Sequence, residues 1–137
     1  MGLSIEDRLS IHELISLHGH LTDDRQHEKL GLLFTDDASY DITAYGLGVV
    51  QGLGALIELF RQRPGTQPVG HHVTNVIVEP DPDPHADADP DRARVRSKGL
   101  AVMADGTAGT VTYDDVVVRT ESGWRMAHRR VVPARTD

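Results

Sequence analysis

The second half of the chain constrains the fold most, because it consists of alternating polar and apolar stretches separated by short turns. The pattern predicts strands over residues 92–103, 110–119 and 124–132, with turns at 105–106 and 121–123. Residues 70–78 form a further predicted strand before this group. Strands that follow one another through such short turns pair antiparallel, so we expect a mainly antiparallel sheet.

The first half is predominantly helical. Apolar residues at helical spacing predict helices over residues 4–22, 27–34 and 52–63, and Ser4 and Asp7 resemble a capping box at the first of them. Residues 35–37 are expected to end the helical region, and 39–42 and 48–50 to form short strands. Residues 79–91, rich in proline and aspartate, are expected to be a solvated surface loop. The class is therefore α+β, with residues 1–137 as one domain.

Composition excludes several functions. The formal net charge of −7 argues against nucleic-acid or anionic-membrane binding, and the absence of cysteine excludes disulfides and thiol chemistry. No apolar run is long enough to span a bilayer, and no signal pattern opens the chain, so we expect a cytoplasmic protein. The glycines match no nucleotide-binding loop, and no serine lies in a nucleophile turn.

The predicted strand at 70–78 carries unusual polar residues. Strand alternation places four residues on one face, namely His71, Val73, Asn75 and Ile77, and turns His72 and Thr74 to the other. An imidazole and a carboxamide among apolar neighbours can furnish a small pocket. His71 suits general acid–base catalysis, because the pKa of an unperturbed histidine is about 6.5. A purely structural histidine pair is the alternative.

His18 lies on the apolar stripe of the first predicted helix, where a histidine either satisfies its ring nitrogens in the core or lines a cavity. Asp23 is the nearest acidic residue, and it can meet His18 only if the helix ends near residue 22. The histidines lack metal-binding spacing, so we expect no metal and no organic cofactor. Polar residues farther along the chain are additional candidates: Tyr40, Asp41, Tyr113, Asp115 and Arg129.

Several segments together resemble the SnoaL-like proteins of the nuclear-transport-factor-two-like superfamily, near the scytalone dehydratase and bile-acid dehydratase branch. They are Leu-Phe-Thr-Asp-Asp-Ala-Ser-Tyr-Asp, His-His-Val-Thr-Asn, and Gly-Trp-Arg-Met-Ala-His-Arg-Arg-Val. The resemblance covers residues 5–132 and implies a cone: three helices on a strongly curved mixed sheet, with an apolar pocket between them. It also implies that His18, Asp23 and His71 are catalytic and that Arg129 contacts substrate. His18 stands where that branch has tyrosine.

The resemblance implies a cofactor-independent lyase or isomerase, such as a dehydratase or polyketide cyclase. Its substrate would be an apolar, oxygenated polyketide, steroid or terpenoid. His71 with Asp23 would remove a proton, and His18 and Asn75 would bind the developing enolate oxygen. The expected pocket contacts are Tyr40, Leu14, Phe34, Phe60 and Val73. The alternatives are a non-catalytic ligand-binding protein and the β-subunit of a ring-hydroxylating dioxygenase. A homodimer or homotrimer is expected through an outer sheet face that carries Thr110, Thr112, Val116 and Val118.

Overall fold

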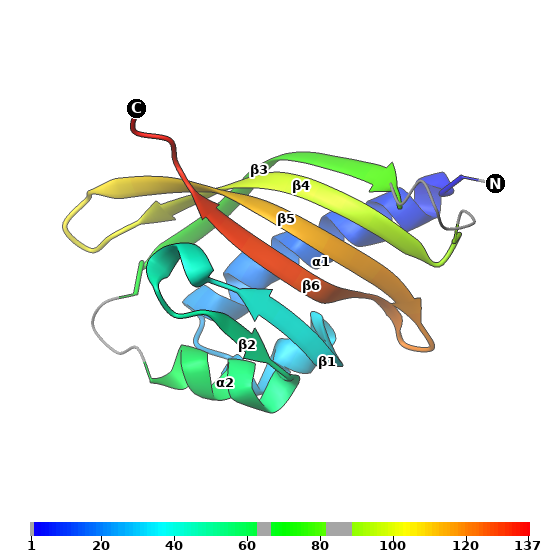
Figure 1. Ribbon diagram of the computed structural model, residues 1–137, viewed down its shortest axis with the longest axis horizontal. Helices are drawn as coiled ribbons and strands as arrows, with labels where there is room; N and C mark the ends of the chain where they lie inside the picture. Colours follow the sequence, from blue (N-terminus) through cyan, green and yellow to red (C-terminus); the bar gives the residue numbers. More distant parts are fainter. Residues whose placement is uncertain (1, 63–66, 82–88) are drawn as a thin grey trace.

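The computed structural model describes residues 2–62, 67–81 and 89–137 (Figure 1). The elements within these ranges are α1 (Ile5–Asp23), the 3-10 helix η1 (His27–Leu32), β1 (Phe34–Asp41), the 3-10 helix η2 (Thr43–Tyr45), β2 (Val49–Gln51), α2 (Leu53–Arg61), β3 (Gly70–Pro80), β4 (Arg92–Val102), β5 (Ala108–Thr120) and β6 (Gly123–Pro133). The predicted α+β class is confirmed. Among the helices in the described ranges, none is long and apolar enough to cross a bilayer.

The six strands form one mixed sheet in the order β2-β1-β6-β5-β4-β3. β1 pairs with β6 in parallel, and the other neighbouring strands pair antiparallel. β6 therefore lies between β5, its neighbour in sequence, and β1, from the first half of the chain (Figure 1). This arrangement unites the two halves of the chain in a single sheet.

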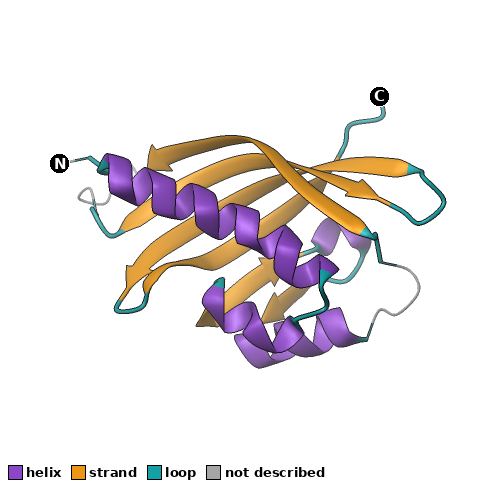
Figure 2. Ribbon diagram, turned by 180° about the vertical axis from the view of Figure 1, so that it is seen from behind, coloured by secondary structure: helices purple, strands orange, loops and turns teal. Residues whose placement is uncertain are grey.

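Helix α1 begins with the predicted capping box. The Ser4 hydroxyl accepts a hydrogen bond from the Asp7 backbone N–H at 3.0 Å, and the Asp7 carboxylate accepts one from the Ser4 N–H at 3.1 Å. The helix lies across one face of the sheet (Figure 2). Its buried stripe is Ile11, Leu14, Ile15, His18, Leu21 and Thr22. The C-terminal part of this stripe carries the polar residues that face the site.

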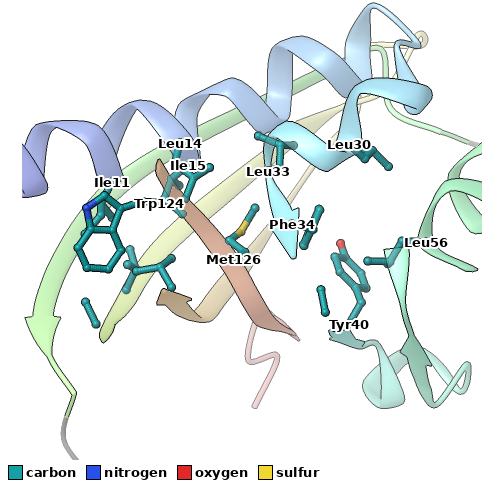
Figure 3. Packing of buried hydrophobic residues seen from close by; sticks show 14 of the residues in the cluster. Ile11, Leu14, Ile15, Leu30, Leu33, Phe34, Tyr40, Leu56, Trp124 and Met126 are labelled. Carbon is teal, nitrogen blue, oxygen red and sulfur yellow. The ribbon is translucent and has the colours of Figure 1, made fainter. Parts of the chain in front are cut away.

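The hydrophobic core fills the space between α1 and the sheet and extends toward α2 (Figure 3). Ile11 and Ile15 of α1 are buried with Trp124 and Met126 of β6, and Phe34 opens β1 beside them. Burying each large apolar side chain contributes about 1.5–3 kcal/mol. The core therefore fixes α1 relative to the central strands.

Two boundaries differ from the sequence prediction. The second helix is a 3-10 helix that ends at Leu32, and β1 begins at Phe34, so the expectation that residues 35–37 end the helical region is wrong. Phe34 pairs with Met126 of β6, and regular pairing resumes only at Ser39. This irregular stretch leaves Asp36 and Asp37 exposed, which is why their sequence is typical of a loop.

The predicted loop over residues 79–91 also differs at its start. Residues 79–80 belong to β3, and residues 82–88 of the predicted loop lie outside the described residues.

Bulges interrupt the alternation of two strands. In β3, Thr74 pairs with Lys98 and Ile77 with Arg96, so Asn75 and Val76 together oppose one residue of β4, and Asn75 has a φ of 56°. In β6, Met126 pairs with Val117 and His128 with Val116, which leaves Ala127 as the extra residue. Each bulge shifts the following residues to the other face of the sheet. Both shifts affect predicted site residues.

Candidate functional site

His71 and Asp23 form the central pair of the site. His71 is the second residue of β3, Asp23 is the last residue of α1, and His71 Nδ1 lies 2.6 Å from Asp23 Oδ1. The His71 backbone N–H also donates to both Asp23 carboxylate oxygens, at 3.2 and 3.1 Å. Because an ionised carboxylate only accepts hydrogen bonds, Nδ1 carries the ring proton and Nε2 carries the lone pair. The arrangement orients an imidazole that can act as a base.

A close contact between α1 and β3 positions this pair. A Cβ added at Gly19 would lie 2.6 Å from the carbonyl oxygen of His71, inside ordinary contact distance. Only glycine therefore allows the helix backbone to approach the strand this closely. Gly19 is one turn from Asp23 on the same helix, so this contact helps to set the distance between Asp23 and His71.

A cavity of about 190 Å³ lies beside His71. The expected contacts His18, Tyr40 and Phe60 line it. The structure adds further lining residues, and these are Thr22, Ile42, Tyr45, Leu47, Leu59, Gln67, Pro68, Gly99, Ala101, Val111, Tyr113 and Val131. Asp23 is not among these lining residues, but it lines a neighbouring polar hollow together with His71. His71 therefore borders the cavity and contacts the carboxylate at the same time.

His18 is almost completely buried, with 5% of its surface exposed. Its ring makes edge contacts with Phe34 and Phe60, at centroid distances of 6.2 and 6.1 Å. Its Nε2 atom has no hydrogen-bond partner among the described residues. Burial, and after it the positive charge of Arg129, holds the pKa of His18 well below its usual 6.5. A neutral imidazole therefore lines the cavity at neutral pH.

Arg129 lies in a buried ion pair. Its Nε and one terminal nitrogen donate to the two carboxylate oxygens of Asp115 at 2.8 and 2.9 Å, and both residues are at most 1% exposed. Burial raises the pKa of Asp115, and the Arg129 guanidinium acts in the opposite direction. The guanidinium carbon lies 3.9 Å from the ring centroid of Tyr113. Tyr113 lines the main cavity, whereas Arg129 lines only a smaller hollow near His18.

The bulge at Ala127 explains the position of Arg129. Strict alternation would place Arg129 on the face opposite Trp124 and Met126, but the extra residue turns it to the same buried face. Its partner Asp115 is directly opposite in the register of β5 and β6. Arg129 does not line the main cavity, and its predicted contact with substrate stays a prediction.

Other predicted contacts lie elsewhere. The expectation that Asn75 and Ile77 share the inner face with His71 is wrong, because the bulge leaves both exposed and turns Val78 inward. Asn75 does not line the cavity. Leu14 and Phe34 belong to the core, and Val73 lines the smaller hollow near Arg129.

Thr22 is a lining residue outside the sequence prediction. It follows His18 by four residues, and this helical spacing was the available signal. Tyr113, one of the polar candidates from the sequence, also lines the cavity. Its ring lies against Gly99 of β4, where an added Cβ would approach ring atoms to 2.5 Å. Gly99 pairs with Val111, two residues before Tyr113, and its missing side chain leaves room for the ring.

Comparison with known proteins identifies the family of this chain. A model of the SnoaL-like domain matches residues 3–130. The chain belongs to the SnoaL-like family. No curated protein matches it significantly.

Solved structures of similar fold cover nearly all of this SnoaL-like chain. An NTF2-like protein with a cystatin-like fold from Novosphingobium aromaticivorans is 23% identical, with a TM-score of 0.79, over 97% of this chain and 85% of that one. A candidate scytalone dehydratase from the same organism is 19% identical, with a TM-score of 0.74, over 96% and 86%. A candidate aromatic ring hydroxylase from that organism is 28% identical, with a TM-score of 0.72, over 96% and 92%. These similarities establish the NTF2-like fold, a fold whose members include dehydratases and isomerases.

Proposed function

We propose that this SnoaL-like protein is a cofactor-independent lyase or isomerase that removes a proton next to a carbonyl group. The observation that carries the proposal is the contact between His71 Nδ1 and Asp23 Oδ1 at 2.6 Å, beside a mostly apolar cavity. A histidine oriented by a carboxylate is a general base whose unperturbed pKa lies near neutrality. The candidate scytalone dehydratase with the same fold is consistent with such chemistry.

The chemistry can be written with this chain's own groups. His71 Nε2 takes a proton from the carbon next to the carbonyl, and the bond electrons move into an enolate. His18 donates a hydrogen bond to the enolate oxygen when its Nε2 carries the ring proton. The imidazolium of His71 is stabilised by Asp23. It then returns its proton to a leaving β-hydroxyl, which departs as water, or to the γ-carbon, which shifts the double bond. Asn75, which is exposed, has no part in this scheme.

Turnover of a panel of small β-hydroxy ketones and unsaturated ketones tests the proposal. We expect His71→Ala to lower kcat by about 10²- to 10⁴-fold, the usual contribution of a general base. Asp23→Asn should cause a large loss as well, because the amide cannot stabilise the imidazolium. His72→Ala is the matched control, since His72 is the next residue and is exposed. Full turnover in both His71→Ala and Asp23→Asn would refute the assignment.

The β-subunit of a ring-hydroxylating dioxygenase is a second candidate. The similarity to a candidate aromatic ring hydroxylase, at 28% identity over 96% of this chain, favours it. This role requires a larger catalytic partner. Purification of the tagged chain from its native cells at low salt should then retain that partner in a stoichiometric complex, and recovery of the chain alone would count against this role.

A further inference from the structure

The charge of the cavity wall restricts its ligand. Among the described residues that line the cavity, none is Lys, Arg, Asp or Glu. The nearby cation Arg129 is engaged by Asp115 and lies under the ring of Tyr113. An anionic ligand would lose its hydration without gaining a free counter-charge. The cavity therefore favours a neutral molecule.

The size of the cavity sets a second limit. Its volume is about 190 Å³. An apolar cavity of about 150 Å³ holds benzene, and pockets for drug-sized ligands begin near 300 Å³. The space therefore fits one substituted ring or two small fused rings. A four-ring steroid, included among the substrates expected from the sequence, exceeds it.

Two polar atoms define where a ligand oxygen would bind. His18 and Thr22 are one helical turn apart on α1, and both line the cavity. His18 Nε2 and Thr22 Oγ1 are buried, and neither has a hydrogen-bond partner among the described residues. Buried polar atoms rarely lack a hydrogen-bond partner, so each of these two atoms calls for an explanation. A ligand oxygen that bridges the two side chains would provide one.

We propose that the cavity binds an uncharged ketone or alcohol of one or two small rings, with its oxygen hydrogen-bonded to Thr22 and His18. Thr22 is then a substrate-binding residue, one helical turn beyond His18 on the buried stripe of α1. This inference rests on the proposed function, in which the bound oxygen is the carbonyl oxygen of the substrate and becomes the enolate oxygen. Binding itself requires no turnover, so the two can be tested separately.

The experiment measures dissociation constants of four probes for the full chain by calorimetry or ligand-observed NMR. The probes are indanone, its hydrocarbon analogue indane, benzoate and the steroid androstenedione. We expect wild-type protein to bind indanone more tightly than each of the others. Tighter binding of benzoate or androstenedione would overturn the charge or size limit.

Variants at Thr22 test the oxygen contact. Thr22→Val removes the hydroxyl at nearly constant shape, and we expect it to reduce the indanone-to-indane preference by about three- to tenfold, the effect of one hydrogen bond. Thr22→Ser should restore most of the preference. Thr74→Val is the matched control, because Thr74 is exposed on β3 and does not line the cavity. An unchanged preference in Thr22→Val would refute the contact.

Separate measurements of binding and of turnover on the wild-type chain distinguish this inference from the proposed catalysis. If probes bind as expected but no ketone substrate is turned over, the ligand class stands and the proposed function fails. If turnover is found only with charged or four-ring substrates, the function stands and the ligand class fails.

Discussion

Gly19→Ala offers the sharpest test of how the site is positioned. The added Cβ would lie 2.6 Å from the His71 carbonyl oxygen, whereas ordinary contacts begin at 3.4 Å. Since the obstructing atom belongs to the backbone, α1 and β3 must separate by roughly 0.8 Å. Alanine stabilises a helix by about 1 kcal/mol relative to glycine, whereas overpacking destabilises the folded protein by about 1–3 kcal/mol. We expect the free energy of unfolding to fall by about 1 kcal/mol, which lowers the Tm by about 3–4 °C for a chain of this length.

Gly54→Ala is the matched control for this variant. Gly54 is exposed in α2, and a Cβ there would have nothing within 4 Å, so we expect a gain of about 0.5 kcal/mol. Urea unfolding can be followed by the fluorescence of Trp124, the only tryptophan and a buried one. Turnover should fall in Gly19→Ala alone, because a displacement near 1 Å can cost about 10²-fold in rate. Equal stabilisation of both variants would refute the close-contact argument.

Three further predictions concern buried polar groups and can be checked by urea unfolding. Asp115→Asn should lower the free energy of unfolding by about 3–5 kcal/mol, because it leaves the Arg129 guanidinium buried without its counter-charge. Asp114→Asn, at a partly exposed ion pair, should lower it by at most about 1 kcal/mol. Because the folded-state pKa of His18 is lowered, the unfolded chain takes up the proton first, and stability should fall below pH 6.5 by up to about 1.4 kcal/mol per pH unit. His18→Phe removes this titrating group, so the free energy of unfolding should depend on pH less steeply, by the contribution of one proton. An unchanged pH dependence would count against a buried neutral imidazole. Thr22→Val should stabilise the ligand-free protein by about 1–2 kcal/mol, since it removes an unpaired buried hydroxyl, and a loss of stability would show that the hydroxyl has a partner.

The features that sequence could predict are those governed by local periodicity. The Ser4–Asp7 capping box located the start of α1, and alternation located β4 and β5. Pairing of His71 with Asp23 followed from the family resemblance, and the structure brings the two side chains together.

Strand alternation places residues at or beyond a bulge on the wrong face. Asn75 and Arg129 each lie at or after an extra residue, and alternation alone cannot reveal where a strand gains one. The partnership of Arg129 with Asp115 depends on the register of two strands, which no single strand encodes. The same limit applies to Tyr113, whose place over Gly99 is set by the pairing of β4 with β5.

The central position of β6 bears on how the protein folds during synthesis. β1 can find its parallel partner only after residues 123–133 have left the ribosome, more than 80 residues after β1 itself. Until then β1 and β2 can form only a two-stranded ribbon, which is marginally stable in water. Pairing across such a sequence separation slows folding, and the apolar face of α1 stays uncovered meanwhile. A nascent chain stalled before β6 should therefore be sensitive to protease and bind chaperones, whereas one stalled well after it should resist digestion.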